Sequence, residues 1–168
     1  MAGDVVDLIL ADHRKFEALL RDIRNEEEDQ EEALRELAAV LVAHAEAEEK
    51  EVYPKLRRKD AIDSEKAEHG EHEHAEGHES LLRVLEVGDP SKEDFGDALE
   101  ELTKDLAHHL DEEERTILNP AREEIEESIR QELGRAFMEE RQRQLDNDCG
   151  DIENVRRLVE EARASGDL

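Results

Sequence analysis

Seven polar side chains stand where the surrounding pattern of apolar residues predicts a buried side chain such as leucine. Each lies three or four residues from an apolar residue or from another member of the set, the spacing that marks one face of a helix. Burying such groups without partners costs about 1–3 kcal/mol each, and a domain has a net stability of only about 5–15 kcal/mol. They must therefore pair with one another or share a bound ion. The seven are His13, His44, Glu48, His74, His78, His109 and Glu113.

Imidazole and carboxylate groups together make a ligand set for first-row transition metals. His44 and Glu48 are four residues apart, so they lie one above the other on a helix, roughly 6 Å apart, and two further pairs in the set repeat this spacing. Seven ligands are too many for one ion with an open position. They suit two ions about 3.5–4 Å apart, with carboxylates between them. Nitrogen and oxygen ligands without thiolate favour iron, manganese or zinc.

Other histidines and acids nearby fall off the apolar stripe. His69 and His72 are expected to be solvated and to form weak surface sites at most. The pair His108 and Glu112 has the spacing of a ligand pair but lies beside the stripe, and Glu17 is left out for the same reason. A lone buried histidine is more often a hydrogen-bonded core residue than a ligand. The metal interpretation therefore depends on all seven residues lying at one level.

Two residues just beyond Glu48 could act on the site without binding metal. Tyr53 is the only tyrosine. Its phenol could donate a hydrogen bond to bound peroxide; the alternative is an aromatic side chain that packs at a helix end. Glu51 lies one helical turn beyond Glu48 and could orient a ligand histidine by accepting its N–H.

The seven side chains can meet only if several helices bring them to one level. Four segments carry apolar residues at alternating spacings of three and four, separated by polar breaks at 25–32, 57–66 and 87–94. Short connections make consecutive helices antiparallel neighbours, so the sequence predicts an all-α, up-down-up-down four-helix bundle. The polar positions lie early in the first and third helices and late in the second and fourth, which places them in one layer.

Two local signals mark the ends of the fourth helix. Ser91 is expected to cap its start, and Asn119-Pro120 is expected to end it. Residues 1–121 are predicted to form the bundle domain, and residues 122–168 a C-terminal helical extension that packs along the bundle or forms an oligomer contact. The chain is expected to be a monomer or a homodimer. The helical pattern of the extension is visible at Ile125, Ile129, Leu133 and Phe137.

The composition limits the classes of partner. The chain has 168 residues and a formal net charge of −27, from 50 acidic and 23 basic residues. This argues against nucleic acid and against anionic membrane surfaces as partners, although scarce lysine would also suit a salt-rich cytoplasm. Cys149 is the only cysteine, which favours a reducing, cytoplasmic location. We find no signal peptide and no apolar run near the roughly 20 residues that span a bilayer.

The chain resembles the hemerythrin-like, or HHE cation-binding, family over residues 4–121, in its HAEAEEKEVYP, HAEGH and HLDEEERTILNP segments and in His13 after LILAD. The resemblance implies two non-haem iron ions in a four-helix bundle, a solvent-derived oxo or hydroxo bridge, and bridging carboxylates at Glu48 and Glu113. Oxygen-carrying hemerythrins have an aspartate five residues after the last histidine. Here Glu113 follows His109 by four, as in bacterial hemerythrin-like proteins, which argues against simple reversible oxygen carriage.

The resemblance leaves several functions open. It links the chain to oxygen or redox sensing, peroxide breakdown, nitric oxide chemistry or iron handling. We expect a di-iron protein that binds O2, peroxide or NO, with catalase-like breakdown of peroxide as its enzymatic form. The alternative is a sensor of iron or redox state whose C-terminal helices act on a partner, and a third hypothesis is a structural zinc bundle. An iron centre absorbs visible light and zinc does not.

Overall fold

The structure, a computed structural model, describes residues 3–168 and is helical, with no strand in that range. The all-α prediction is confirmed. The α-helices are α1 (Val5–Arg24), α2 (Gln30–Ala47), α3 (Tyr53–Arg58), α4 (Ser64–Val87), α5 (Glu93–Glu113), α6 (Asn119–Glu124), α7 (Glu127–Asp146) and α8 (Ile152–Ser165). Two π-helical turns, η1 (Glu48–Val52) and η2 (Glu114–Leu118), join α2 to α3 and α5 to α6.

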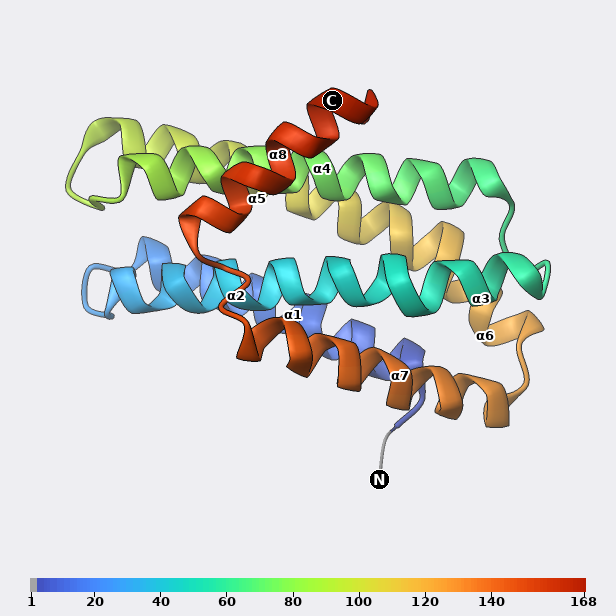
Figure 1. The fold of residues 1–168 in the computed structure, drawn as a ribbon. Helices are drawn as coiled ribbons and strands as arrows, with labels where there is room; N and C mark the ends of the chain where they lie inside the picture. The colour runs from blue at the N-terminus through green and yellow to red at the C-terminus, as the bar shows by residue number, and fades with distance from the viewer. Residues whose placement is uncertain (1–2) are drawn as a thin grey trace.

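The long helices α1, α2, α4 and α5 lie lengthwise beside one another as a bundle (Figure 1). α1 packs against α2, α4 packs against α5, and α2 contacts α4. Each helix directs its apolar stripe inward, and each fully buried leucine or phenylalanine contributes about 1.5–3 kcal/mol. The alternation of helix direction stays a prediction.

Two apolar clusters fill the bundle above and below the polar positions. Along α1, Ile9 belongs to one cluster and Phe16 to the other, with His13 between them. Along the path of α5, Leu106 and Ile117 are divided in the same way. The predicted polar layer is therefore enclosed by hydrocarbon at both ends.

The start of α5 differs from the prediction. Lys92 is the residue before the helix, and no side chain caps it. Ser91 instead donates its backbone N–H and its hydroxyl to the Asp89 carboxylate, at 2.9 and 2.7 Å. The Ser91 side chain therefore closes the turn and cannot cap the helix. Acidic residues in the first turn, Glu93 and Asp94, favour the positive end of the helix dipole instead.

The prediction that Asn119-Pro120 ends the fourth helix is wrong, because the helical path continues through α6. A proline inside an α-helix has no N–H to donate, and its ring clashes with the carbonyl four residues back, here that of Thr116. The turn η2 relieves both problems. Within it, the Asn119 N–H bonds the carbonyl of Glu114, five residues back.

A π turn also precedes a proline after α2. Pro54 follows η1, in which the Tyr53 N–H bonds the Glu48 carbonyl. Each π turn begins at or directly after a predicted ligand carboxylate, Glu48 in one case and Glu113 in the other. The π turns therefore set the direction in which the chain leaves the polar layer.

The C-terminal extension packs on the bundle, which is one of the two predicted arrangements. α7 lies against α1 and α2, and α8 lies against α4 (Figure 1). The turn between them is pressed onto α2: a Cβ built on Gly150 would lie 2.4 Å from the backbone nitrogen of Ala39. The Cys149 thiol contacts the Ala39 carbonyl at 3.3 Å. Within residues 3–168, no helix is both long and apolar enough to cross a membrane.

Candidate metal centre

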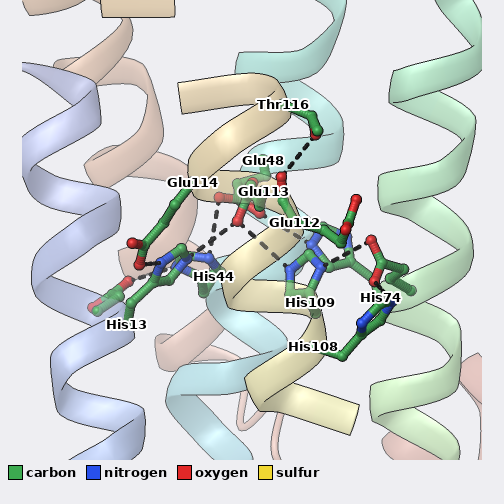
Figure 2. Close-up of polar contacts among 12 residues, drawn as sticks. His13, His44, Glu48, His74, His108, His109, Glu112, Glu113, Glu114 and Thr116 are labelled. Carbon is green, nitrogen blue, oxygen red and sulfur yellow. Dashed lines mark hydrogen bonds and ion pairs between the residues drawn. The ribbon is translucent and has the colours of Figure 1, made fainter. Parts of the chain in front are cut away.

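The seven predicted residues are all buried and come together from α1, α2, α4, η1 and α5. Figure 2 shows six of them pointing toward a common region between the helices. Nitrogen and oxygen atoms of six of them form two groups, in each of which every atom lies within 4.8 Å of the others. Six of the seven therefore lie at one level, and His78 lies beside the second group. The first group contains His13, His44, Glu48 and Glu113, and the second contains Glu48, His74 and His109.

Glu48 is the residue that both groups share. Its Oε1 lies 3.1 Å from Nε2 of His44, and its Oε2 lies 3.0 Å from Nε2 of His74. Both of these imidazole nitrogens and Glu48 Oε1 are buried and make no hydrogen bond to any residue of the described range. A buried polar atom without a partner costs about 1–3 kcal/mol. A cation placed among these atoms would satisfy them, so the donor set fits a metal ion.

Glu113 lies between histidines of both groups in a similar way. Its Oε2 is 3.1 Å from Nε2 of His13 and 3.6 Å from Nε2 of His109. Both nitrogens of His109 are buried and find no hydrogen-bond partner within residues 3–168. Two carboxylates thus stand between two sets of imidazoles, which is the arrangement that can hold two cations close together.

His78 is buried next to the second group without belonging to it. Its Nε2 has no hydrogen-bond partner among the described residues. Burial, followed by the charges of His74 and His109, lowers the pKa of His78 to about 3. His78 is therefore a neutral imidazole with a free lone pair. With His74 and His109 it lines a cavity of about 10 Å³, which is about the space of one water molecule.

Carboxylates orient three of the ligand histidines from behind. An imidazole whose Nδ1 donates to a carboxylate has its ring direction set, which leaves Nε2 facing the metal side. These supporting acids are absent from the sequence-based prediction. The Nδ1–carboxylate pairs are His13 with Glu114 at 3.0 Å, His44 with Asp12 at 3.0 Å, and His74 with Glu49 at 2.8 Å. For His109, Glu73 stands at 3.8 Å from Nδ1.

The supporting acids form a ring around the bundle. Each is the sequence neighbour of a predicted ligand on one helix and supports the histidine of another. Asp12, beside His13, supports α2, while Glu49 in η1, at the end of α2, supports α4. Glu73 of α4 faces α5, and Glu114, which directly follows α5, supports α1. The signal that could have identified them is an acid directly adjacent to one predicted ligand in each of the four segments.

The prediction that Glu51 orients a ligand histidine is wrong, because Glu49 does so. In an α-helix, three residues beyond Glu48 would return to the same face. The segment Glu48–Val52 is a π turn with bonds over five residues, so its turn is wider and Glu51 no longer completes it. Glu51 instead lines a surface pocket beside Glu140 of α7.

The electric field of the site favours the protonated forms of His44 and His74 in the absence of metal. Burial lowers the pKa of His44, but the charge of Glu48 and the hydrogen bond to Asp12 outweigh it and raise the pKa to about 10. Burial likewise opposes charge on His74, and the bonds to Glu48 and Glu49 raise its pKa well above the ordinary value. Burial raises the pKa of Glu48, yet the neighbouring His44 holds it well below normal. A metal ion must displace these protons.

Tyr53 both packs at the helix end and reaches the site. Its hydroxyl donates to Glu113 Oε1 at 2.8 Å and lies 3.4 Å from Glu48 Oε2. Its ring stacks on His74, with centroids 5.8 Å apart and an interplanar angle of 6°. The absence of a side chain at Gly70 makes room for it, since a Cβ there would lie 3.0 Å from the phenol oxygen. Tyr53 therefore contacts both carboxylates that stand between the two groups.

The C-terminal extension also reaches the site, through α7. Arg141 donates two hydrogen bonds to Asp12, from Nε at 2.9 Å and from a terminal nitrogen at 2.8 Å. The same Asp12 accepts from His44, and the ring of Phe137 meets the His44 ring edge-on at 5.6 Å. The contacts that α7 makes join residues more than ninety positions apart, so no local pattern in the sequence indicates them.

Comparison with known proteins gives one match. The family model described as Hemerythrin HHE cation binding domain matches residues 4–121, which is more than half of the chain. No curated protein and no solved structure matches. The matched region contains all seven predicted ligand positions and Tyr53, and it ends before α7 begins.

Proposed function

The chain belongs to the hemerythrin HHE cation-binding domain family, and on that premise we propose that it holds two iron ions and binds O2, peroxide or NO beside them. The observation that carries the proposal is the position of Glu48, whose two oxygens contact imidazoles of two different groups. The up-down-up-down order of the four long helices is part of the proposal. With short connections, this order brings all four polar positions to one level.

The proposed ligands divide between the two ions. His13 and His44 would hold the first ion, and His74, His78 and His109 would hold the second. Glu48 and Glu113 would contribute to both. Iron suits this set because imidazole and carboxylate ligands without thiolate are typical of non-haem iron. When bound, the iron pair supplies reversible electron transfer to a small oxygen- or nitrogen-containing ligand.

The protein itself supplies orientation, exclusion of water and a proton donor. Glu114, Asp12 and Glu49 hold three imidazoles in register, as described above. Leu41, Ala45 and Leu106 line the cavity beside His78 together with the three histidines, so hydrocarbon covers most of the part of the cavity that the imidazoles do not. The Tyr53 hydroxyl lies within the site, and burial together with Glu113 and Glu48 raises its pKa well above the ordinary value. It therefore remains a hydrogen-bond donor at neutral pH.

Metal content with a visible absorption spectrum tests the proposal. The purified chain should bind two iron ions and absorb in the visible when oxidised. Glu48→Ala should lose both ions, because both groups share that side chain, whereas His44→Ala should weaken the first group alone. His108→Ala is the matched control, since its side chain is 64% exposed and belongs to neither group. Full iron content in Glu48→Ala would refute the shared-ligand assignment.

The contacts of α7 favour a second candidate, a sensor of iron or redox state. Arg141 and Phe137 connect His44 to a helix outside the family match. Loss of metal would alter the surroundings of His44 and would therefore loosen the packing of α7 against the bundle. Amide hydrogen exchange in α7 should then rise when iron is removed. Equal hydrogen exchange in α7 with and without iron would refute the sensor function.

A further inference from the structure

A pocket between α2, η1, α4 and α8 leads from the surface toward the second group of ligands. Its volume is about 250 Å³. We call it the vestibule. α8 forms one of its walls, so it exists only because the C-terminal extension docks on α4. The titratable residues that line it are Glu46, Glu49, Glu71, His78, Glu161 and Asp167.

The charge of the vestibule is strongly negative and only partly balanced. Lys50 lies 3.5 Å from Glu46, and Arg157 pairs with Glu161 at 2.6 Å. Glu71 makes no ion pair with any residue between positions 3 and 168. Burial, then the charges of Glu49 and Asp167, raises the pKa of Glu71 above the ordinary value. A cation is therefore the guest that this pocket would stabilise.

The inner end of the vestibule meets the metal centre. His78 lines both the vestibule and the small cavity shared with His74 and His109. It is 6% exposed, and its Nε2 has no hydrogen-bond partner in the described part of the chain. Glu49, also in the vestibule wall, accepts a hydrogen bond from His74. One buried imidazole thus separates an acidic pocket from the second group of predicted ligands.

We propose that the vestibule is the uptake port for divalent iron, which collects the hydrated cation at Glu71 and Glu161 and passes it by way of His78 to the buried centre. This rests on the proposed function as an iron protein. It adds a role for α8, which lies outside the family match. A cleft lined by charge of one sign raises the local concentration of the opposite ion and speeds association.

Uptake and release kinetics of the full chain test the port. Metal-free protein is mixed with Fe²⁺ and the approach to two bound ions is followed; loaded protein is then challenged with a strong chelator. Glu71→Gln/Glu161→Gln should slow both uptake and release by about tenfold. The final iron content should not change, because neither residue is a proposed ligand. Folding is not at risk, since Glu71 carries its charge unfavourably and Glu161 forms only an exposed pair.

The matched control is Glu100→Gln/Glu101→Gln, which removes the same charge from an exposed part of α5. It should load at the wild-type rate. Equal slowing in both double variants would overturn the port, because net charge alone would explain it. So would wild-type kinetics in the vestibule variant. A wild-type chain that binds no iron would instead refute the proposed function.

A second candidate route for iron, lined by one acid and two exposed histidines, can be tested in the same experiment. On another face, Glu73 lies 3.3 Å from His69 and 3.4 Å from His108, both exposed, and 3.8 Å from the buried His109. If His69→Gln/His108→Gln slows uptake while the vestibule variant does not, iron arrives by that face and the vestibule proposal is wrong.

Discussion

Replacing Arg141 with methionine tests whether α7 supports the metal centre. Methionine keeps much of the aliphatic stem of arginine, so the change removes the guanidinium with little loss of packing. The side chains of Arg141 and Asp12 are only 13% and 9% exposed, and they share two hydrogen bonds. Removing one partner of a buried ion pair costs about 3–5 kcal/mol. Because Asp12 keeps its hydrogen bond to His44, we expect Arg141→Met to lower the free energy of unfolding by about 3 kcal/mol, the lower end of this range.

The loss should depend on pH in a defined direction. Burial raises the pKa of Asp12, but the hydrogen bonds and charges of His44 and Arg141 outweigh it, so the net pKa lies below 3.8. The stabilisation from a depressed carboxylate pKa is fully present above the unfolded value and is lost as the pH falls through the folded one. The difference between wild type and Arg141→Met should therefore be full at pH 7 and shrink below about pH 4.

Urea unfolding of the metal-free protein measures this difference directly, and iron titration measures its effect on the centre. Groups that orient a metal-ligating histidine change metal affinity by about 10–100-fold when removed, so iron affinity should fall toward this range. Arg83→Ala is the control, because its pair with Glu79 is exposed and spans 3.7 Å; it should change stability by less than about 0.5 kcal/mol. An Arg141→Met variant as stable as this control would refute the idea that α7 supports the metal centre through Arg141.

The remaining predictions concern Tyr53, the protonation of His44, and two glycines. Tyr53→Phe should keep two iron ions but change the rate of reaction with peroxide, and an unchanged rate would limit Tyr53 to packing. Metal-free protein should lose thermal stability as the pH rises from 6.5 to 10, because folding raises the pKa of His44 from 6.5 to about 10. A raised pKa stabilises the folded state only at pH values below the folded pKa. Iron binding at pH 7 should therefore release protons, which a pH indicator detects. Gly150→Ala should expose α7 and α8 to protease through its clash with Ala39, while Gly96→Ala, which meets no atom within 4 Å, should gain about 0.5–1 kcal/mol of stability.

The buried polar positions that are proposed as ligands could be predicted from the sequence because the geometry of an α-helix is local. A residue three or four places from buried apolar residues shares their face whatever the rest of the chain does. His44 and Glu48 could be placed in the interior on that basis, and Glu112 could be kept out. The same logic failed at Glu51, where the π turn replaces the α-helical spacing.

The support of the centre was decided by tertiary packing. Asp12 of α1 forms a hydrogen bond with His44 of α2, and Arg141 of α7 donates to Asp12 from 129 positions away in the chain. The vestibule likewise exists only where α8 closes over α4. Periodicity specifies which face of a helix is buried, but it carries no information on which other helix covers that face. Contacts between distant segments are selected by the shape and charge of whole surfaces. The sequence alone therefore determined the proposed ligand positions, and only the tertiary structure determined which groups support them and which pocket leads to them.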